Sequence, residues 1–101
     1  MRLTDLKASF IKFQDHHLVY VNSLEEAQGI IFLCPNHFKE NNGPIGTHSI
    51  ICCFQNKGVP DDVLPGIHRW PATGKDLEDL TLNPSVDAGC FHGWIINGNI
   101  S

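Results

Sequence analysis

The sequence lacks the long apolar segments that mark membrane and secreted proteins. No apolar run approaches the roughly 18 residues that a membrane-spanning helix needs, so we expect no membrane segment. The first residues, Met1 to Lys7, lack the apolar centre of a secretory signal peptide. These absences together predict a cytoplasmic protein, in which free or metal-bound cysteines are more common than disulfides.

Signatures of several enzyme classes are also missing. The chain contains no His-Glu-x-x-His, no Gly-x-Ser-x-Gly, no phosphate-binding loop and no His-x-Glu with a Pro-Cys-x-x-Cys. Metalloproteases, α/β-hydrolases, nucleotide-dependent enzymes and zinc deaminases use these patterns. Without them, we favour a non-enzymatic role.

Basic residues are few in this chain. Seven Lys and Arg stand against 11 Asp and Glu, which gives a net charge of -4 at pH 7. Proteins that bind nucleic acid neutralise phosphates with Lys and Arg, so we expect no direct nucleic-acid binding. An acidic chain suits a partner with a basic surface. Asp61 and Asp62, in the loop Gln55–Ile67, are candidates for that contact, and a solvated connection is the equal alternative.

The residues that are present predict one small, mainly β domain over residues 1–101. A chain of 101 residues, 42% hydrophobic, buries only a modest core, so a structural metal would help it to fold. We expect a compact antiparallel β-sheet domain (small α+β) with one short helix. The expected strands are Ala8–Lys12, His17–Val21, Ile30–Leu33, His48–Phe54, Arg69–Gly74, Leu80–Leu82 and Cys90–Ile96.

Two local signals are strong enough to place individual elements. The helix is expected at Asn22–Gly29, because Ser23 and Glu26 form a capping-box pair and Gly29 suits the helix end. Asn97-Gly98 is a hairpin signal, so the last residues are expected to fold back on the preceding strand. Asn83-Pro84-Ser85 is expected to turn the chain.

Two Cys/His pairs suggest a zinc site. Cys34 and His37 are three residues apart after an apolar run, and Cys90 and His92 are two apart on an expected strand. Residues i and i+2 of a strand face the same side, so Cys90 and His92 would point together. Zinc binds Cys sulfur and His nitrogen tetrahedrally, and closed four-residue sites are usually structural. The favoured ligands are therefore Cys34, His37, Cys90 and His92.

Other readings of the same residues stay open. His48, Cys52 or Cys53 could replace one ligand. On the expected strand His48 and Cys52 share one face and Cys53 lies on the other, so one of these two cysteines is expected to face away from the core. The cysteines could also be small buried hydrophobic residues. A zinc hydrolase or nuclease that uses Asp87 or His48 is the enzymatic alternative, and it would need an open coordination position.

The chain resembles a family of short, functionally uncharacterised proteins of tailed bacteriophages and prophages. The resemblance rests on Ser23–Ile30, Phe32–Pro35, Gly46–His48, Gly58–Asp61, Arg69–Trp70, Asp79–Ser85 and Cys90–Gly93. The closing pattern, DLTLNPS followed by CFHG, is the most specific part. In the relatives a cysteine often stands where His37 stands here, which implies a metal site of the same kind. The resemblance supplies no activity.

The resemblance to phage proteins and the negative net charge together suggest that the protein binds a host protein. One form is an inhibitor of a host defence machine, such as a CRISPR effector, whose basic groove an acidic surface could occupy. A virion or assembly accessory protein is a further alternative.

Overall fold

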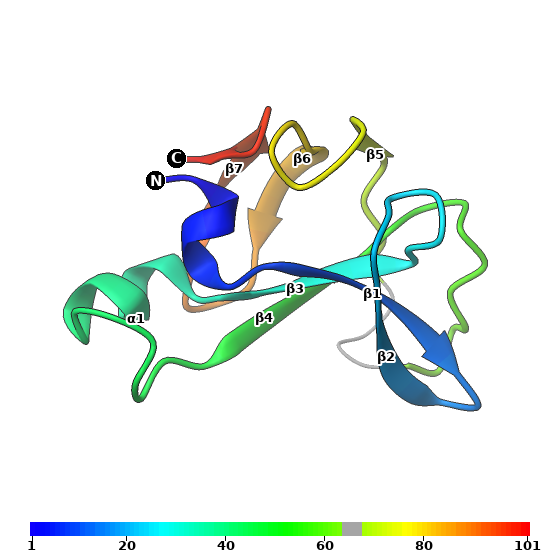
Figure 1. Cartoon of the computed structure of the whole chain (residues 1–101), viewed down its shortest axis with the longest axis horizontal. Coiled ribbons are helices and arrows are strands. Elements are labelled where there is room, and N and C mark those ends of the chain that lie inside the picture. Colours follow the sequence, from blue (N-terminus) through cyan, green and yellow to red (C-terminus); the bar gives the residue numbers. More distant parts are fainter. Residues whose placement is uncertain (64–67) are drawn as a thin grey trace.

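A computed structural model describes residues 1–63 and 68–101 of the chain. The expected mainly β architecture is present as two four-stranded antiparallel sheets (Figure 1). The strand orders are β2-β1-β3-β4 and β5-β6-β7-β8. The elements are η1 (a 3₁₀ helix, Leu3–Leu6), β1 (Ser9–Gln14), β2 (His17–Val21), β3 (Gly29–Leu33), α1 (Pro35–Glu40), β4 (Ser49–Cys53), β5 (Ala72–Thr73), β6 (Thr81–Asp87), β7 (His92–Ile96) and β8 (Asn99–Ile100).

The first sheet buries one row of apolar side chains that crosses three strands. Phe10 of β1 lies opposite Ile30 of β3, and Ile30 lies opposite Cys52 of β4. Residues that face each other across a sheet share one face, and all three belong to the core. The apolar run of the third strand therefore supplies the centre of this layer.

The second sheet alternates between a buried and an exposed face. On β7, Gly93 and Ile95 are buried while His92, Trp94 and Ile96 are exposed, which is the period-two pattern of a strand with one solvated face. The hairpin predicted at Asn97-Gly98 is present and pairs β7 with β8. Both turn residues have positive φ, 50° and 73°, as a tight two-residue hairpin requires.

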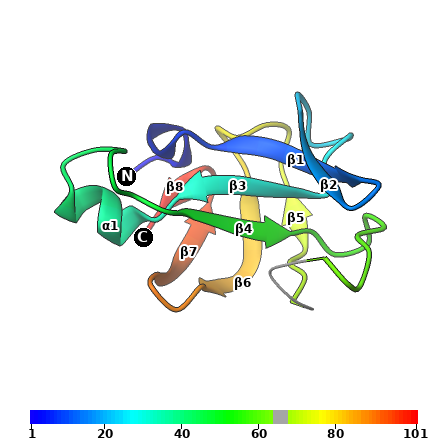
Figure 2. The same cartoon turned by 90° about the horizontal axis from the view of Figure 1, so that it is seen from below.

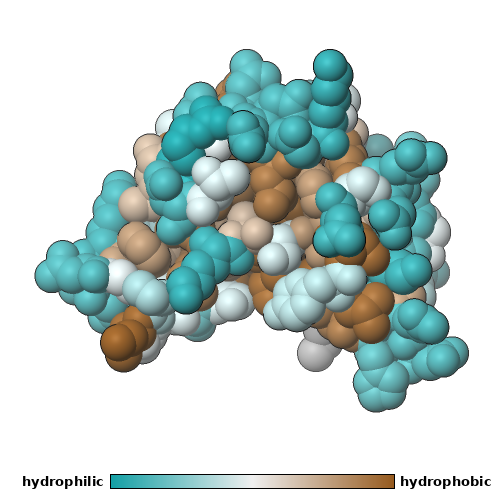
Figure 3. Space-filling model, viewed as in Figure 1, coloured by the Kyte–Doolittle hydropathy of each residue, from teal (hydrophilic) through white to brown (hydrophobic). Residues whose placement is uncertain are grey.

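The two sheets pack face to face around one core and are joined at both sides. In Figure 2 the long strands of the first sheet run across those of the second. Phe54, after β4, forms a bridge with Trp70, before β5, and Arg2 forms a bridge with Asn99 of β8. Both sheets remain open, with β2, β4, β5 and β8 as their edge strands. On the face of the molecule shown in Figure 3, hydrophilic side chains lie mostly along the outline and hydrophobic ones show nearer the middle. No helix in the described residues is long and apolar enough to cross a membrane.

The position of the single α-helix differs from the prediction. In the segment expected to be helical, Asn22–Gly29, the chain forms turns and bends before Gly29 begins β3. The hydroxyl of Ser23 does accept a hydrogen bond from the amide of Glu26 at 3.3 Å. The helix lies instead at Pro35–Glu40, with Pro35 in its first turn. Proline is tolerated there because the first helical N–H has no partner inside the helix. The capping signal near Ser23 was thus sufficient for a turn but not for a helix.

Two other boundary predictions need correction. The expected turn Asn83-Pro84-Ser85 lies inside β6, where the pairing with β7 shifts register between Leu82 and Val86. The expected strand over Arg69–Gly74 shrinks to the two residues of β5, which is an edge strand. Residues 64–67 of the expected loop Gln55–Ile67 lie outside the described part of the chain.

Candidate metal centre

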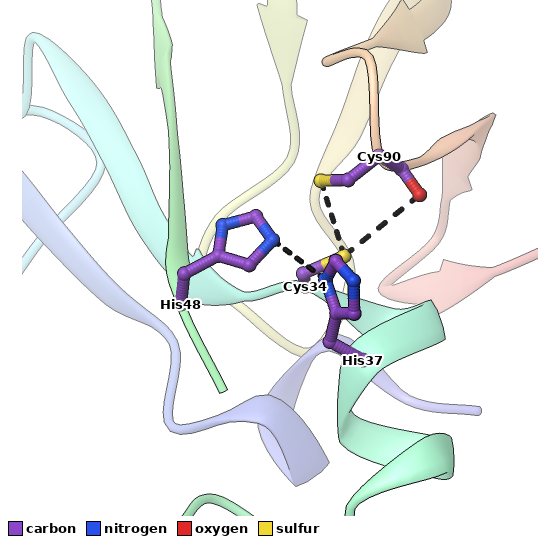
Figure 4. Close-up of side chains that lie close together, drawn as sticks. All are labelled: Cys34, His37, His48 and Cys90. Atoms are coloured by element: carbon purple, nitrogen blue, oxygen red, sulfur yellow. Dashed lines mark hydrogen bonds between the residues drawn. The ribbon is translucent and has the colours of Figure 1, made fainter. Parts of the chain in front are cut away.

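Four side chains from three segments of the sequence meet in one group (Figure 4). They are Cys34, His37, His48 and Cys90, and one ligand atom from each lies within 4.8 Å of all the others. The group is close enough to hold one metal ion. We call these four residues the Cys/His centre.

Cys34 and His37 are positioned by the start of α1. Cys34 is the residue before the helix and has an extended backbone, and its carbonyl accepts the first helical hydrogen bond, from Phe38 at 2.9 Å. Residues three apart lie on the same side of a helix. The short helix therefore brings the imidazole of His37 to the thiol of Cys34, as their spacing predicted.

His48 is brought to the centre by the pairing of β3 with β4. Leu33 lies opposite Ser49 at the end of this ladder, so the next pair outward is Cys34 with His48. The amide of Cys34 indeed donates to the carbonyl of His48 at 2.9 Å. The side chains continue this contact, because Nδ1 of His37 lies 2.7 Å from Nε2 of His48.

Cys90 reaches the centre from the turn between β6 and β7. In this turn the amide of Cys90 donates to the carbonyl of Ala88 at 3.0 Å, and Gly89 has a φ of 82°. The side-chain amide of Asn36, on α1, donates to the carbonyl of Cys90 at 2.8 Å. The thiols of Cys34 and Cys90 then lie 3.2 Å apart.

His92, favoured as a ligand from the sequence, does not join the Cys/His centre. It is the first residue of β7, whereas Cys90 lies in the preceding turn. The two residues therefore do not share a strand face, which was the basis of the prediction. The Nε2 atom of His92 lies 3.4 Å from the hydroxyl of Ser85 instead. His48, one of the alternative ligands, occupies the fourth position.

His48 could have been placed from the sequence by a register argument. If the apolar run Ile30–Leu33 pairs with the strand that follows the next loop, the residues at the open end of that pair must face each other. Cys34 follows the first strand and His48 precedes the second. The prediction from spacing alone missed His48, because spacing relates only residues that are close in the sequence.

The remaining two cysteines are far less accessible. Cys52 and Cys53 are both 0% exposed, so the expectation that one of them faces away from the core holds only in part: both sides of β4 are covered here. Burial raises the pKa of Cys52 to about 12 and also raises that of Cys53, against the lowering effect of Arg69. Neither thiol belongs to the Cys/His centre, and neither is activated.

Burial also acts on the thiol of Cys90. It raises the pKa of Cys90 to about 11, and the hydrogen bond with Cys34 contributes to the same shift. In the chain without an ion, the Cys34–Cys90 contact thus favours the protonated thiol. A bound cation would reverse this preference, because it stabilises the thiolate.

A groove of about 390 Å³ adjoins the centre on the side of His48. Its lining includes Cys52, His68, Trp70 and Asp87, and the rings of His68 and Trp70 lie 4.1 Å apart. The carboxylate of Asp87 accepts a hydrogen bond from the amide of Gly89 at 3.1 Å, which is a common role for Asp in a turn. A larger hollow, of about 490 Å³, lies away from the Cys/His centre, beside Lys57 and Lys75.

Asp61 and Asp62, the expected partner-facing residues, lie on the surface. Asp62 is 69% exposed and lies 3.4 Å from His16, which is equally exposed. Neither carboxylate belongs to the Cys/His centre. Their position leaves them accessible to a partner.

No protein-family model matches the chain, and neither the curated proteins nor the solved structures include a significant match to it. The functional reading therefore rests on the residues themselves.

Proposed function

We propose that the Cys/His centre binds one zinc ion and that the ion fastens the two sheets together. The observation that supports this is the convergence of two thiols and two imidazoles within 4.8 Å. Zinc favours such mixed sulfur and nitrogen sets, and sites with four protein ligands are usually structural.

Two separations within the centre lie near those of a tetrahedral zinc site. In a tetrahedral zinc site two sulfurs lie about 3.8 Å apart and two imidazole nitrogens about 3.3 Å apart. The corresponding separations here are 3.2 Å and 2.7 Å. Each pair would need to open by only about 0.6 Å to admit the ion. Rotation about side-chain bonds is sufficient for such a change.

The ligands come from both halves of the fold. Cys34, His37 and His48 belong to the end of the first sheet and its helix, whereas Cys90 belongs to the β6–β7 turn of the second sheet. An ion would thus join segments that are 56 positions apart in the sequence. In a domain with a modest core, metal binding contributes directly to the free energy of folding.

Metal content of purified variants tests the proposal. We expect one zinc per chain in the wild type and its loss in His48→Ala, because three ligands hold zinc more weakly than four. The matched control is His92→Ala, which changes an exposed histidine outside the centre and should retain the metal. Zinc that is retained in His48→Ala and lost in His92→Ala would reject this ligand set. A wild type without bound metal would reject the site.

We further propose that this zinc-binding domain acts in the cytoplasm of an infected bacterium. There it would bind a host protein. The net charge of -4 supports a partner with a basic surface, and the exposed Asp61 and Asp62 support contact through that loop. Pull-down with wild-type protein and with Asp61→Asn/Asp62→Asn tests this proposal. A partner that binds both forms equally at low and high salt would contradict it.

A zinc hydrolase or nuclease remains the second candidate because a groove adjoins the centre. His48 and Asp87 both line this groove, so an ion at the centre would lie beside a space for a substrate. Four protein ligands leave no position for water, however, and His48 would have to leave the ion. Hydrolysis that persists in His48→Ala with added zinc, and disappears in Asp87→Asn, would favour this candidate.

A further inference from the structure

We propose that Cys34 and Cys90 form a reversible disulfide bond when no metal holds them, so that the centre has a metal-bound and an oxidised state. The disulfide itself does not depend on the proposed zinc site, whereas the exclusion of one state by the other does. The observation that carries the proposal is the contact between the two thiols, whose Sγ atoms lie 3.2 Å apart.

This separation lies between the two states. A disulfide requires the sulfurs to approach to about 2.05 Å, which is about 1.2 Å closer than they are. A tetrahedral zinc site requires about 3.8 Å, which is about 0.6 Å farther apart. The same pair of side chains can therefore move in either direction, but a sulfur pair cannot satisfy both geometries at once.

The local backbone allows the approach. Cys90 lies in a turn rather than in a strand ladder, and the preceding Gly89 has nothing within 4 Å of the position of an added Cβ. Cys34 lies at the junction of β3 and α1, outside the paired residues of β3. Movement of the β6–β7 turn toward α1 therefore breaks no strand pairing.

Solvent exposure distinguishes the Cys34–Cys90 pair from the other two cysteines. Cys90 is partly exposed, whereas Cys52 and Cys53 are completely buried. Cys34 is buried as well, but it lies against Cys90. An oxidant in solution therefore meets Cys90 first, and Cys34 is the thiol in position to resolve the product.

The chemistry needs a two-electron oxidant, and a peroxide is one. The thiol of Cys90 loses its proton to solvent, and its sulfur attacks a peroxide oxygen, which forms a sulfenic acid and releases hydroxide. The Cys34 sulfur then attacks the Cys90 sulfur, a disulfide forms, and water leaves. With hydrogen peroxide, two thiols and one peroxide give one disulfide and two waters. A bound zinc ion would occupy the sulfur lone pairs that this reaction uses. It would be released as Zn²⁺, with no change of oxidation state, when the disulfide forms.

Trypsin separates the relevant cysteines, so the wild type can be tested directly. Cleavage after Lys12, Lys39, Lys57 and Lys75 gives one peptide with Cys34, one with Cys52 and Cys53, and one with Cys90. Metal-free protein is treated with hydrogen peroxide and then unfolded in the presence of an alkylating agent, which blocks free thiols. The protein is digested without reductant, and the masses of the peptides are measured by mass spectrometry. We expect the Cys34 and Cys90 peptides in one linked species, about 2 Da lighter than their sum, while Cys52 and Cys53 are alkylated.

A matched variant and a reductant complete the test. Cys52→Ala should still form the link between the Cys34 and Cys90 peptides. In Cys34→Ala no link can form, and Cys90 should be oxidised irreversibly. Dithiothreitol should restore both thiols in the wild type. Separate Cys34 and Cys90 peptides after peroxide, or a link between two different chains only, would overturn the proposal. The wild-type result stands even if a variant fails to fold.

A parallel arm separates this inference from the proposed zinc function. Zinc-loaded protein should form the link about tenfold or more slowly and should release one zinc for each disulfide, which a colorimetric chelator measures. A link at the same rate in protein that holds one zinc would overturn the exclusion while the zinc site stands. A link in protein that never binds zinc would support the disulfide and reject the zinc site.

Discussion

The Nδ1 atom of His37 faces the Nε2 atom of His48 at 2.7 Å, and their rings meet edge to face with centroids 4.7 Å apart. The two residues stand on either side of the loop that joins α1 to β4. Within that loop the hydroxyl of Thr47 donates to the carbonyl of Gly43 at 2.8 Å and accepts from the side chain of Asn41 at 3.1 Å. The loop therefore sets the separation of the two imidazoles.

Removal of the Thr47 hydroxyl should weaken metal binding. Thr47→Val keeps the size of the side chain but loses both hydrogen bonds, so the loop would hold His48 less firmly. We expect the dissociation constant for zinc to rise about tenfold, which corresponds to one or two lost hydrogen bonds. Competition with a chromophoric chelator measures it. Thr73→Val, on the exposed β5, is the control, and an equal effect in both variants would contradict a role for the loop.

Asn36 should act as a positioning residue for Cys90. Its side chain holds the carbonyl of Cys90 at 2.8 Å, and it connects α1 to the β6–β7 turn. Loss of such an outer contact typically costs 10- to 100-fold in metal affinity, so we expect a fall of about tenfold in Asn36→Ala. Asn22→Ala, an exposed asparagine in another turn, should leave the affinity unchanged. Wild-type affinity in Asn36→Ala would show that the turn is held by the ion alone.

Removal of the metal should lower thermal stability. At a free zinc concentration one hundred times the dissociation constant, binding stabilises the fold by about 2.7 kcal/mol. For a domain of this size, that corresponds to a fall of about 10 °C or more in melting temperature when a chelator is added. Circular dichroism melting curves with and without chelator provide the measurement. The chelator should have no effect on Cys90→Ser, whose metal site is already broken, and an equal shift there would point to a different cause.

Gly93 and Gly89 should differ sharply in their tolerance of a side chain. A Cβ at Gly93 would collide with the carbonyl of Ser101 and approach the ring of Phe91 to 2.7 Å, whereas a Cβ at Gly89 meets nothing within 4 Å. We expect Gly93→Ala to lower the free energy of unfolding by about 3 kcal/mol. Gly89→Ala should cost about 1 kcal/mol, because only its positive φ is strained. Urea unfolding checks both, and similar costs would contradict the close packing of the C-terminus on β7.

Asp79 should make stability depend on acid pH. Its carboxylate accepts hydrogen bonds from the amides of Asp76 and Lys75, and these lower its pKa below the ordinary value. Because the folded state binds the proton more weakly than the unfolded state, the contribution is present above the unfolded pKa and lost as pH falls through the folded pKa. NMR titration of the carboxyl carbon of Asp79 should give a midpoint below that of an aspartate in an unstructured peptide. Asp79→Asn should show less loss of stability between pH 5 and pH 3, whereas Glu40→Gln should behave as the wild type.

Some of the structure could be predicted because it depends on neighbours along the chain. The strand His17–Val21, the hairpin at Asn97-Gly98 and the proximity of Cys34 to His37 all follow from residues that are close in the sequence. The helix did not follow, because the hydroxyl of Ser23 accepts a hydrogen bond from the amide of Glu26 in a turn as it would at the start of a helix. Pro35 is the first residue of α1, a position that proline suits.

The sequence by itself determined the fold class and the residue types of the centre: mainly β from its short apolar segments, and thiols with imidazoles from its composition. It also supplied Cys34, His37 and Cys90 as members of the group. Only the tertiary structure decided that His48, and not His92, stands with them. The choice depends on the register of β3 with β4 and on the place where β7 begins. Both are set by the packing of residues distant in the chain, and a shift of one residue in a strand turns every side chain to the opposite face.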